Sequence, residues 1–113
     1  MAKVANIKKG EKYDIYIGRP SKYGNIFSHL PHSRNTIYVP TREAAVQAYE
    51  DWLLGREYTD IKQDRRYWIL EHLRQLKGKT LGCYCSPLPC HGDVLVKLVK
   101  KIEDQDETQE YHN

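Results

Sequence analysis

Four side chains that are able to bind a metal ion or to act as nucleophiles lie close together in the last third of the sequence. They are Cys83, Cys85, Cys90 and His91. Alternate residues of a strand point to the same side, so a predicted strand over residues 80–85 projects Cys83 and Cys85 together. The proline-bounded turn after this strand returns the chain, which brings Cys90 and His91 toward that pair at the start of a predicted helix.

This cluster is compatible with three kinds of chemistry. The four side chains supply a Cys₃His ligand set for zinc, although structural zinc sites usually contain C-x-x-C and the spacing here is C-x-C. Alternatively, Cys90 is a nucleophile activated by the helix start and by His91, which makes Cys90, His91 and Asp93 the candidate catalytic residues. In the third alternative, the cysteines fill the buried side of a strand and His91 caps the helix. The sequence leaves open which alternative holds, and with it whether the protein is an enzyme.

A second polar segment follows a predicted strand over residues 13–17. Its candidate ligand-binding residues are Gly18, Arg19, Ser21, Gly24 and Asn25. Arg19 has the same parity as Ile15 and Ile17, so its side chain is predicted to start on the buried face, where a guanidinium requires a carboxylate or a phosphate. The segment is neither a Walker A loop nor a dinucleotide-binding fingerprint. An Arg–carboxylate pair within the fold is the alternative to ligand binding.

The pattern along the chain predicts strands over residues 13–17, 36–39 and 80–85. It predicts one helix after the N-cap Thr41, a second from Asp64 to Gly78, and a third that begins near Cys90 and runs through Ile102. Helices between strands are typical of an α/β or α+β domain, so we expect a small sheet of about three to four strands covered by about three helices. We expect a single domain over residues 1–103 and an acidic, flexible tail over 104–113.

The two polar segments are predicted to meet. In parallel sheets, ligands bind beyond the C-terminal ends of the strands. Arg19 follows one predicted strand, and Cys90 and His91 follow another and open a helix. If these strands are parallel neighbours, both segments face one cleft, and its arginine, helix start and tyrosines suit a phosphorylated or nucleotide-like small molecule.

Composition and charge restrict the classes of partner. The chain has 113 residues, of which 29% are charged, and its net charge of +3 is mildly basic, so nucleic acid is the less favoured partner. No apolar run approaches the ~20 residues that span a bilayer, and no apolar signal-peptide stretch is visible at the start. We therefore expect a protein of the reducing cytoplasm, where clustered cysteines serve as metal ligands, reactive thiols or buried thiols rather than structural disulfides.

Three stretches of the chain carry a joint pattern. They are Tyr16-Ile17-Gly18-Arg19-Pro20-Ser21-x-x-Gly24-Asn25-x-Phe27, then Tyr49-x-x-Trp52-Leu53, then Leu76-x-Gly78-Lys79-x-Leu81-x-Cys83-x-Cys85-x-Pro87-x-x-Cys90-His91-Gly92-Asp93-Val94-Leu95. This pattern resembles domain of unknown function 4326, a family found in bacteria and phages. The resemblance implies a compact α/β domain of phage or prophage origin that acts in the host cytoplasm, and it implies no established activity. It includes every candidate site residue named above.

The sequence thus predicts a small-molecule binding domain, with or without enzymatic activity, for a nucleotide-like or other anionic ligand. In this interpretation Arg19, Ser21 and Asn25 hold the anion, and Cys90, His91 and Asp93 face it from the helix start. The alternative is a zinc-stabilised module that binds nucleic acid or protein. The basic residues over 60–79 are interpreted as a solvated helix face. The sequence does not indicate an oligomeric state.

Overall fold

A computed structural model describes residues 1–33, 35–85 and 88–112, with side chains up to residue 106. Its main sheet contains β1 (Lys3–Asn6), β5 (Thr80–Cys83) and β2 (Ile15–Tyr16), in the order β1-β5-β2. All of these strands run parallel, with Val4 and Ile15 both opposite Leu81. A second small parallel sheet pairs β3 (Phe27–Ser28) with β4 (Ile37–Tyr38). A short 3₁₀ helix, Ile7–Lys9, follows β1.

Helix α1 has a start and a stop signal in the sequence, whereas the segment that contains α2 has a stop signal only, because its N-cap Lys62 makes no capping hydrogen bond. Helix α1 (Arg42–Leu53) begins after Thr41, whose Oγ1 accepts the N–H of Ala44 at 3.0 Å, and Gly55 follows it at a φ of 75°. Helix α2 (Gln63–His72) continues into a 3₁₀ turn over Leu73–Leu76, and Gly78 follows at a φ of 71°. Positive φ favours glycine, and the predicted end of α1 at Gly55 is confirmed. The α-helical part of the second segment ends at His72, earlier than predicted, and the 3₁₀ turn carries the chain on toward Gly78. Helix α2 begins one residue before the predicted Asp64.

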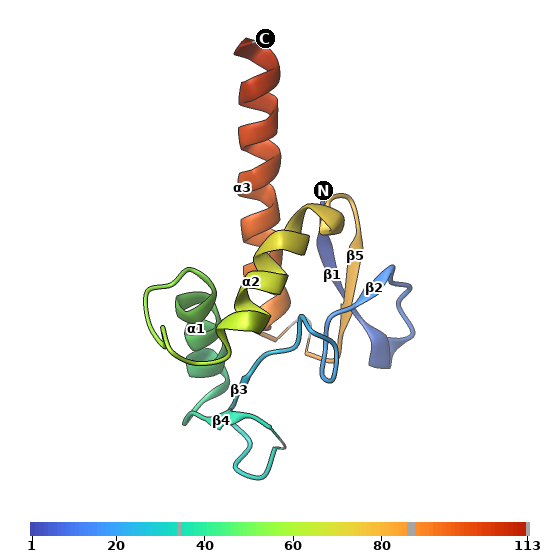
Figure 1. Ribbon diagram of the computed structural model, residues 1–113. Helices are drawn as coiled ribbons and strands as arrows, with labels where there is room; N and C mark the ends of the chain where they lie inside the picture. Colours follow the sequence, from blue (N-terminus) through green and yellow to red (C-terminus); the bar gives the residue numbers. More distant parts are fainter. Residues whose placement is uncertain (34, 86–87, 113) are drawn as a thin grey trace.

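Helix α3 (His91–His112) connects the sheet to the other helices. Its N-terminal half packs against β1, α1 and the 3₁₀ turn, and its C-terminal half projects away from the body of the molecule (Figure 1). The buried residues Leu95 and Val99 of α3 join Leu81 of β5 and Trp52 of α1 in one core. Apolar burial between the helices and one face of the sheet therefore holds the domain together.

The first turn of α3 lies very close to the sheet. A Cβ at Gly92 would be 2.8 Å from Cδ1 of Ile17 and 3.0 Å from Cγ2 of Val4. The opposite face of the sheet is approached closely at Gly82, where a Cβ would be 2.7 Å from the ring of Tyr13. These glycines allow a helix on one face and an aromatic ring on the other to contact the backbone of short strands.

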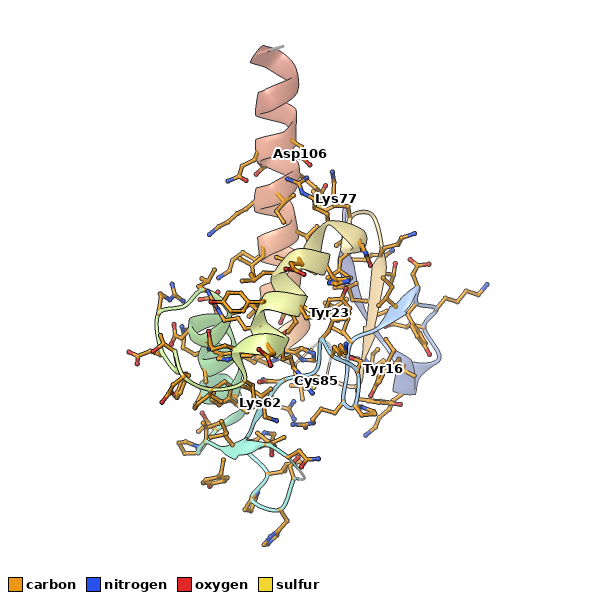
Figure 2. The ribbon with its side chains drawn as sticks, viewed as in Figure 1. Tyr16, Tyr23, Lys62, Lys77, Cys85 and Asp106 are labelled. Carbon is orange, nitrogen blue, oxygen red and sulfur yellow. The ribbon has the colours of Figure 1, made fainter. Side chains whose placement is uncertain are left out.

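The predicted fold class, a small sheet covered by helices, is confirmed. Strands β1 and β3 were not predicted, because neither shows a clear alternation of apolar and polar residues. The division of the chain at residue 103 stays a prediction. The structure continues α3 beyond that point, where Asp106 pairs with Arg74 at 2.7 Å and with Lys77 at 2.9 Å. Figure 2 shows Lys77 and Asp106 together at the place where α3 leaves the body.

Candidate functional site

The segment after β2 and the segment after β5 line one cavity of about 310 Å³. Because β2 and β5 are parallel neighbours, their C-terminal ends meet at the same edge of the sheet. The first residues of α1 and α3 also reach this cavity, through Arg42 and His91. Three segments that are distant in sequence, within residues 16–29, 42–46 and 83–91, therefore build a single site.

The cavity collects most of the candidate residues. Those that line it are Gly18, Arg19, Asn25, Cys83, Cys85, Cys90 and His91. Ser21, Gly24 and Asp93 do not line it. The two polar segments thus share one cleft, and three of the predicted residues serve to shape the walls instead of facing it.

Arg19 lines the cavity as an exposed residue, so the prediction that its side chain starts on the buried face is wrong. The strand ends at Tyr16, and a turn in which Ser21 N–H donates to Gly18 O at 2.9 Å redirects the chain. Alternation along the strand therefore does not extend to Arg19. The hydroxyl of Tyr16 donates to Arg19 O at 2.6 Å, and Arg19 Nη1 donates to Asn25 O at 3.3 Å.

Asn25 uses its side chain to fix the loop to α1. Its Nδ2 donates to Ala45 O at 3.1 Å, and its Oδ1 accepts the N–H of Phe27 at 2.9 Å. Gly24 lies in a tight turn, where a Cβ would be 3.0 Å from both Cγ of Arg19 and Ser21 O. The Oγ of Ser21 is buried without a hydrogen-bond partner in the described part of the chain. These residues position Arg19.

The three cysteines are in mutual contact. The Sγ atoms of Cys83 and Cys90 are 3.3 Å apart. Both residues are buried, with exposed fractions of 1% and 2%. The Cys90 thiol donates to the sulfur of Cys83, and Cys85 is half-buried and lines the same cavity. The hydrogen bonds from the other two thiols, together with Arg42, lower the pKa of Cys85.

The pKa of Cys90 moves in the opposite direction to that expected for a residue at a helix start. Its hydrogen bonds to Cys83 and Cys85, together with burial, raise the pKa of the Cys90 thiol. The N–H of Gly92 donates to its sulfur at 3.3 Å, which opposes this effect without reversing it. The pKa values of these two thiols are therefore shifted in opposite directions, downward for Cys85 and upward for Cys90.

His91 is buried and held in one orientation. Its Nε2 is 2.7 Å from Ile17 O, and a carbonyl oxygen only accepts, so Nε2 carries the proton. Its Nδ1 is then an acceptor, 3.6 Å from Sγ of Cys90. Burial lowers the pKa of His91 and favours this neutral form. His91 therefore connects the end of β2 to the thiol cluster.

Asp93 caps the start of α3. Its Oδ2 accepts the N–H of Cys90 at 3.1 Å, which satisfies one of the free backbone donors at the helix start. Because Asp93 is exposed and lies outside the cavity, the geometry gives it a role in fixing Cys90 and His91.

Other residues of the cavity were not predicted from the sequence. They are Arg42, Tyr16, Tyr84 and His29, together with apolar wall residues. For Arg42 a signal was present: a cation in the first turn of a helix faces the positive end of the helix dipole, which is an unfavourable position that suggests a separate role. Tyr84 is 50% exposed and packs edge-to-face on Tyr16, with ring centroids 6.0 Å apart.

The charge of the cavity is positive. Arg19 and Arg42 supply guanidinium groups, and the starts of α1 and α3 add the positive ends of two helix dipoles. Among the described residues that line it there is no Asp or Glu.

The zinc prediction has the following structural context. All four members of the Cys₃His set line the cavity. In residues 1–33, 35–85 and 88–112, however, no group of three or more His, Cys, Asp or Glu side chains is arranged to hold a metal ion. The Nε2 atom of His91 is occupied by Ile17 O. The zinc site stays a prediction.

Of the described helices, none is both long and apolar enough to cross a membrane.

Comparison with known proteins gives similar proteins of viral origin. An uncharacterized 12.4 kDa protein from the nrdA-td intergenic region of Enterobacteria phage T4 is 29% identical over 107 residues, which is 94% of this chain and 84% of the phage protein. An uncharacterized protein of Acanthamoeba polyphaga mimivirus is 30% identical over 103 residues, covering 82% of this chain and 72% of the viral protein. No solved structure matches the chain. The model of the family described as Domain of unknown function (DUF4326) matches residues 2–101, and the chain therefore belongs to that family.

Proposed function

We propose that the cavity binds a small anionic, nucleotide-like ligand. The observation that supports this most directly is the charge of the walls: two guanidinium groups and two helix starts face a cavity whose described lining contains no carboxylate. Arginine matches phosphate geometry through paired N–H donors, and the positive end of a helix dipole favours an anion nearby.

Both arginines retain donors for a ligand. A guanidinium has five N–H donors. Nη1 of Arg19 uses one of them on Asn25 O, and Arg42 contacts the sulfur of Cys85. Each guanidinium is therefore held in place and still has unused donors. Because these side chains are already ordered, less side-chain entropy is lost when a ligand binds.

The aromatic wall and the volume favour a nucleotide over a bare phosphate. The exposed ring of Tyr84 offers a face for a planar base, and Tyr16 supports that ring from the side. A volume of about 310 Å³ is at the small end of ligand pockets, which suits one nucleotide unit better than two.

Thermal denaturation with a panel of compounds tests the proposal. The panel contains nucleoside mono-, di- and triphosphates, the matching uncharged nucleosides, and inorganic phosphate. We expect a concentration-dependent rise in melting temperature with at least one nucleotide and none with its nucleoside. Arg19→Gln and Arg42→Gln should each weaken binding about tenfold or more, because each removes a charge-assisted hydrogen bond.

Lys101→Gln is the matched control, because it removes one positive charge from an exposed position of α3 outside the cavity. It should bind like the unaltered chain. Equal weakening in all three variants, or no shift with any anion in the panel, would overturn the proposal.

The viral relatives support a proposal about where the protein acts. One is a phage protein and the other is a protein of a giant virus. We place the protein in the cytoplasm of an infected host, where nucleotides are abundant and cysteines stay reduced. Detection of the chain in the soluble fraction of infected cells tests this placement.

The zinc-stabilised interaction module remains the second candidate, because three cysteine sulfurs are already in mutual contact within the cavity. Metal analysis of protein purified without a histidine tag distinguishes the candidates. About one zinc per chain, with loss of folding on chelation, would favour the module.

A further inference from the structure

We propose that Tyr16 is a positioning residue that sets the separation between an anion-binding part and a base-binding part of the cavity, and that this separation selects a nucleoside monophosphate. The inference rests on the proposed function and deepens it, because it names the class of nucleotide and the residue that discriminates between classes. Tyr16 acts through Arg19 and Tyr84, the side chains that would meet the phosphate and the base.

The backbone of Tyr16 is fixed by the main sheet. Tyr16 is the last residue of β2 and lies opposite Gly82 of β5. The N–H of the next residue, Ile17, donates to Gly82 O at 3.0 Å. The side chain of Tyr16 lines the cavity, and Figure 2 shows it at the C-terminal end of the main sheet, on the same side as Cys85. Tyr16 is therefore a fixed point from which the neighbouring loops can be positioned.

The hydroxyl of Tyr16 holds the backbone of Arg19. It donates to Arg19 O at 2.6 Å. A Cβ at Gly18 would overlap the hydroxyl end of the Tyr16 ring, so glycine leaves this ring the space to reach Arg19. Nη1 of Arg19 in turn donates to Asn25 O at 3.3 Å. Because the backbone and one guanidinium nitrogen of Arg19 are both held, the direction in which its remaining donors meet an anion is restricted.

The ring of Tyr16 holds Tyr84. The two rings pack edge-to-face, with centroids 6.0 Å apart and an angle of 70° between their planes, which is a favourable arrangement for an aromatic pair. Tyr84 lines the cavity and is 50% exposed, so its ring stays accessible to a planar base. The hydroxyl and the ring of one side chain thus hold Arg19 and Tyr84, and a single residue sets the separation between them.

This short separation suits a ligand in which only a sugar lies between the base and the terminal phosphate. In a nucleoside diphosphate or triphosphate, the terminal phosphate lies one or two phosphate groups further from the base. A phosphate monoester carries close to two negative charges at neutral pH, which matches the two guanidinium groups of Arg19 and Arg42. The described lining residues include no lysine and no third arginine to neutralise a longer phosphate chain.

Isothermal titration calorimetry with a series of phosphate chains tests the inference. The probes are the mono-, di- and triphosphates of adenosine, guanosine, cytidine and uridine, titrated into the full chain without metal ions. For at least one base, we expect the monophosphate to bind about fivefold or more tightly than the diphosphate.

Two variants disturb the position of Arg19 in different ways. Tyr16→Phe removes the hydrogen bond to Arg19 O and keeps the ring that packs on Tyr84. Gly18→Ala keeps Tyr16 and displaces its hydroxyl. Tyr38→Phe is the matched control, because it removes a phenol hydroxyl at a position that is 58% exposed and outside the cavity.

We expect Tyr16→Phe and Gly18→Ala each to weaken monophosphate binding about threefold to tenfold, as the loss of one hydrogen bond would. Both should also reduce the preference for monophosphate over diphosphate, and a loss of stability alone would not change that preference. In a chain that carries Arg19→Gln, Tyr16→Phe should add little further loss, because its effect passes through Arg19. Tyr38→Phe should change neither affinity nor preference.

Each other outcome contradicts a specific part of the argument. Equal binding of mono- and diphosphates, tighter binding of a longer phosphate chain, or a monophosphate preference that neither variant alters would overturn the inference and leave the proposed function standing. Equal losses in Tyr16→Phe and Tyr38→Phe would also overturn it. If no nucleotide binds to the unaltered chain, both proposals are wrong.

Discussion

His91 is the residue that contacts both halves of the candidate site. Its Nε2–H donates to Ile17 O at the end of β2, and its Nδ1 faces Cys90 at the start of α3. The ring is buried and packs edge-to-face on Tyr49, with centroids 5.2 Å apart. A buried ring that satisfies a buried carbonyl and an adjacent thiol fixes the distance between the two polar segments.

Substitution of His91 should show how much this connection contributes to stability. In His91→Leu the carbonyl of Ile17 loses its donor, and a buried unpaired carbonyl costs about 1–3 kcal/mol. In His91→Gln the side-chain amide supplies a donor near the position of Nε2, so the loss should be smaller. Urea denaturation of both variants measures the difference. Equal stability of the two would show that the hydrogen bond to Ile17 contributes nothing.

The element that determines the shape of the site is α3. Its first turn is close enough to β1 and β2 that a Cβ at Gly92 would overlap Ile17 and Val4. Its last described charged side chain, Asp106, pairs with Arg74 and Lys77 beyond the edge of the core. Packing at the first turn of α3 and the ion pairs of Asp106 near its other end therefore orient this helix, and its first residue lines the cavity.

Gly92→Ala should destabilise the protein. The added methyl group meets two side chains in the interior, and overpacking of this kind costs about 1–3 kcal/mol. The better helix propensity of alanine returns at most about 1 kcal/mol. Ile17 is fully buried and has little freedom to move aside, so we expect a net loss. Chemical denaturation measures it, and an unchanged or raised stability would show that the helix shifts away from the sheet.

The ion pairs of Asp106 determine how this carboxyl group should titrate at acid pH. The hydrogen bonds from Lys77 and Arg74 lower the pKa of Asp106 below its usual 3.8. A carboxyl with a lowered folded-state pKa stabilises the fold above its unfolded pKa, and this contribution is lost as the pH falls through the folded value. An NMR titration should therefore place the midpoint of Asp106 below 3.8. Lys77→Gln should raise that midpoint, and a midpoint unaffected by this change would contradict the pairing.

Across the whole molecule, the parallel arrangement of β2 and β5 is what makes one site from two segments. The residues after these strands are separated by more than half of the chain, and they meet because both strands end at the same edge. The core that holds this arrangement is apolar and lies between the sheet and the helices. Cys83 and Cys90 are members of that core, but most of its other members are aliphatic and aromatic side chains, whose burial does not depend on a metal ion.

We therefore expect chelation to leave folding intact. Treatment with EDTA should change the melting temperature by no more than about 2 °C, because the core is apolar and His91 is already bonded to Ile17 O. Thermal denaturation of protein purified without a tag, before and after dialysis against chelator, measures this. A large loss of stability that zinc restores would favour the zinc-stabilised module over the nucleotide-binding domain.

Much of the fold could be predicted from local signals in the sequence. Thr41 and Gly55 define α1, Gly78 marks the end of the segment after α2, and the start of α3 follows from the turn before Cys90. Such caps and glycine positions depend on neighbouring residues only, which is why a single sequence reveals them. Strands β1 and β3 were missed because their pairing depends on distant partners and their few residues carry no periodic pattern.

For the site, the residue types predicted that the arginine loop and the cysteine cluster would share a cleft on the condition that their strands were parallel neighbours, and only the structure supplied that strand order. The roles within that cleft were not predictable in the same way. Whether Arg19 is buried, whether Asp93 faces the cavity, and in which direction the pKa of each cysteine is shifted all depend on turns and contacts between distant segments. Arg42 reaches Cys85 across more than forty positions of the chain. A sequence pattern reports residue types and spacing, whereas burial and proton affinity are set by neighbours that only the folded chain brings together.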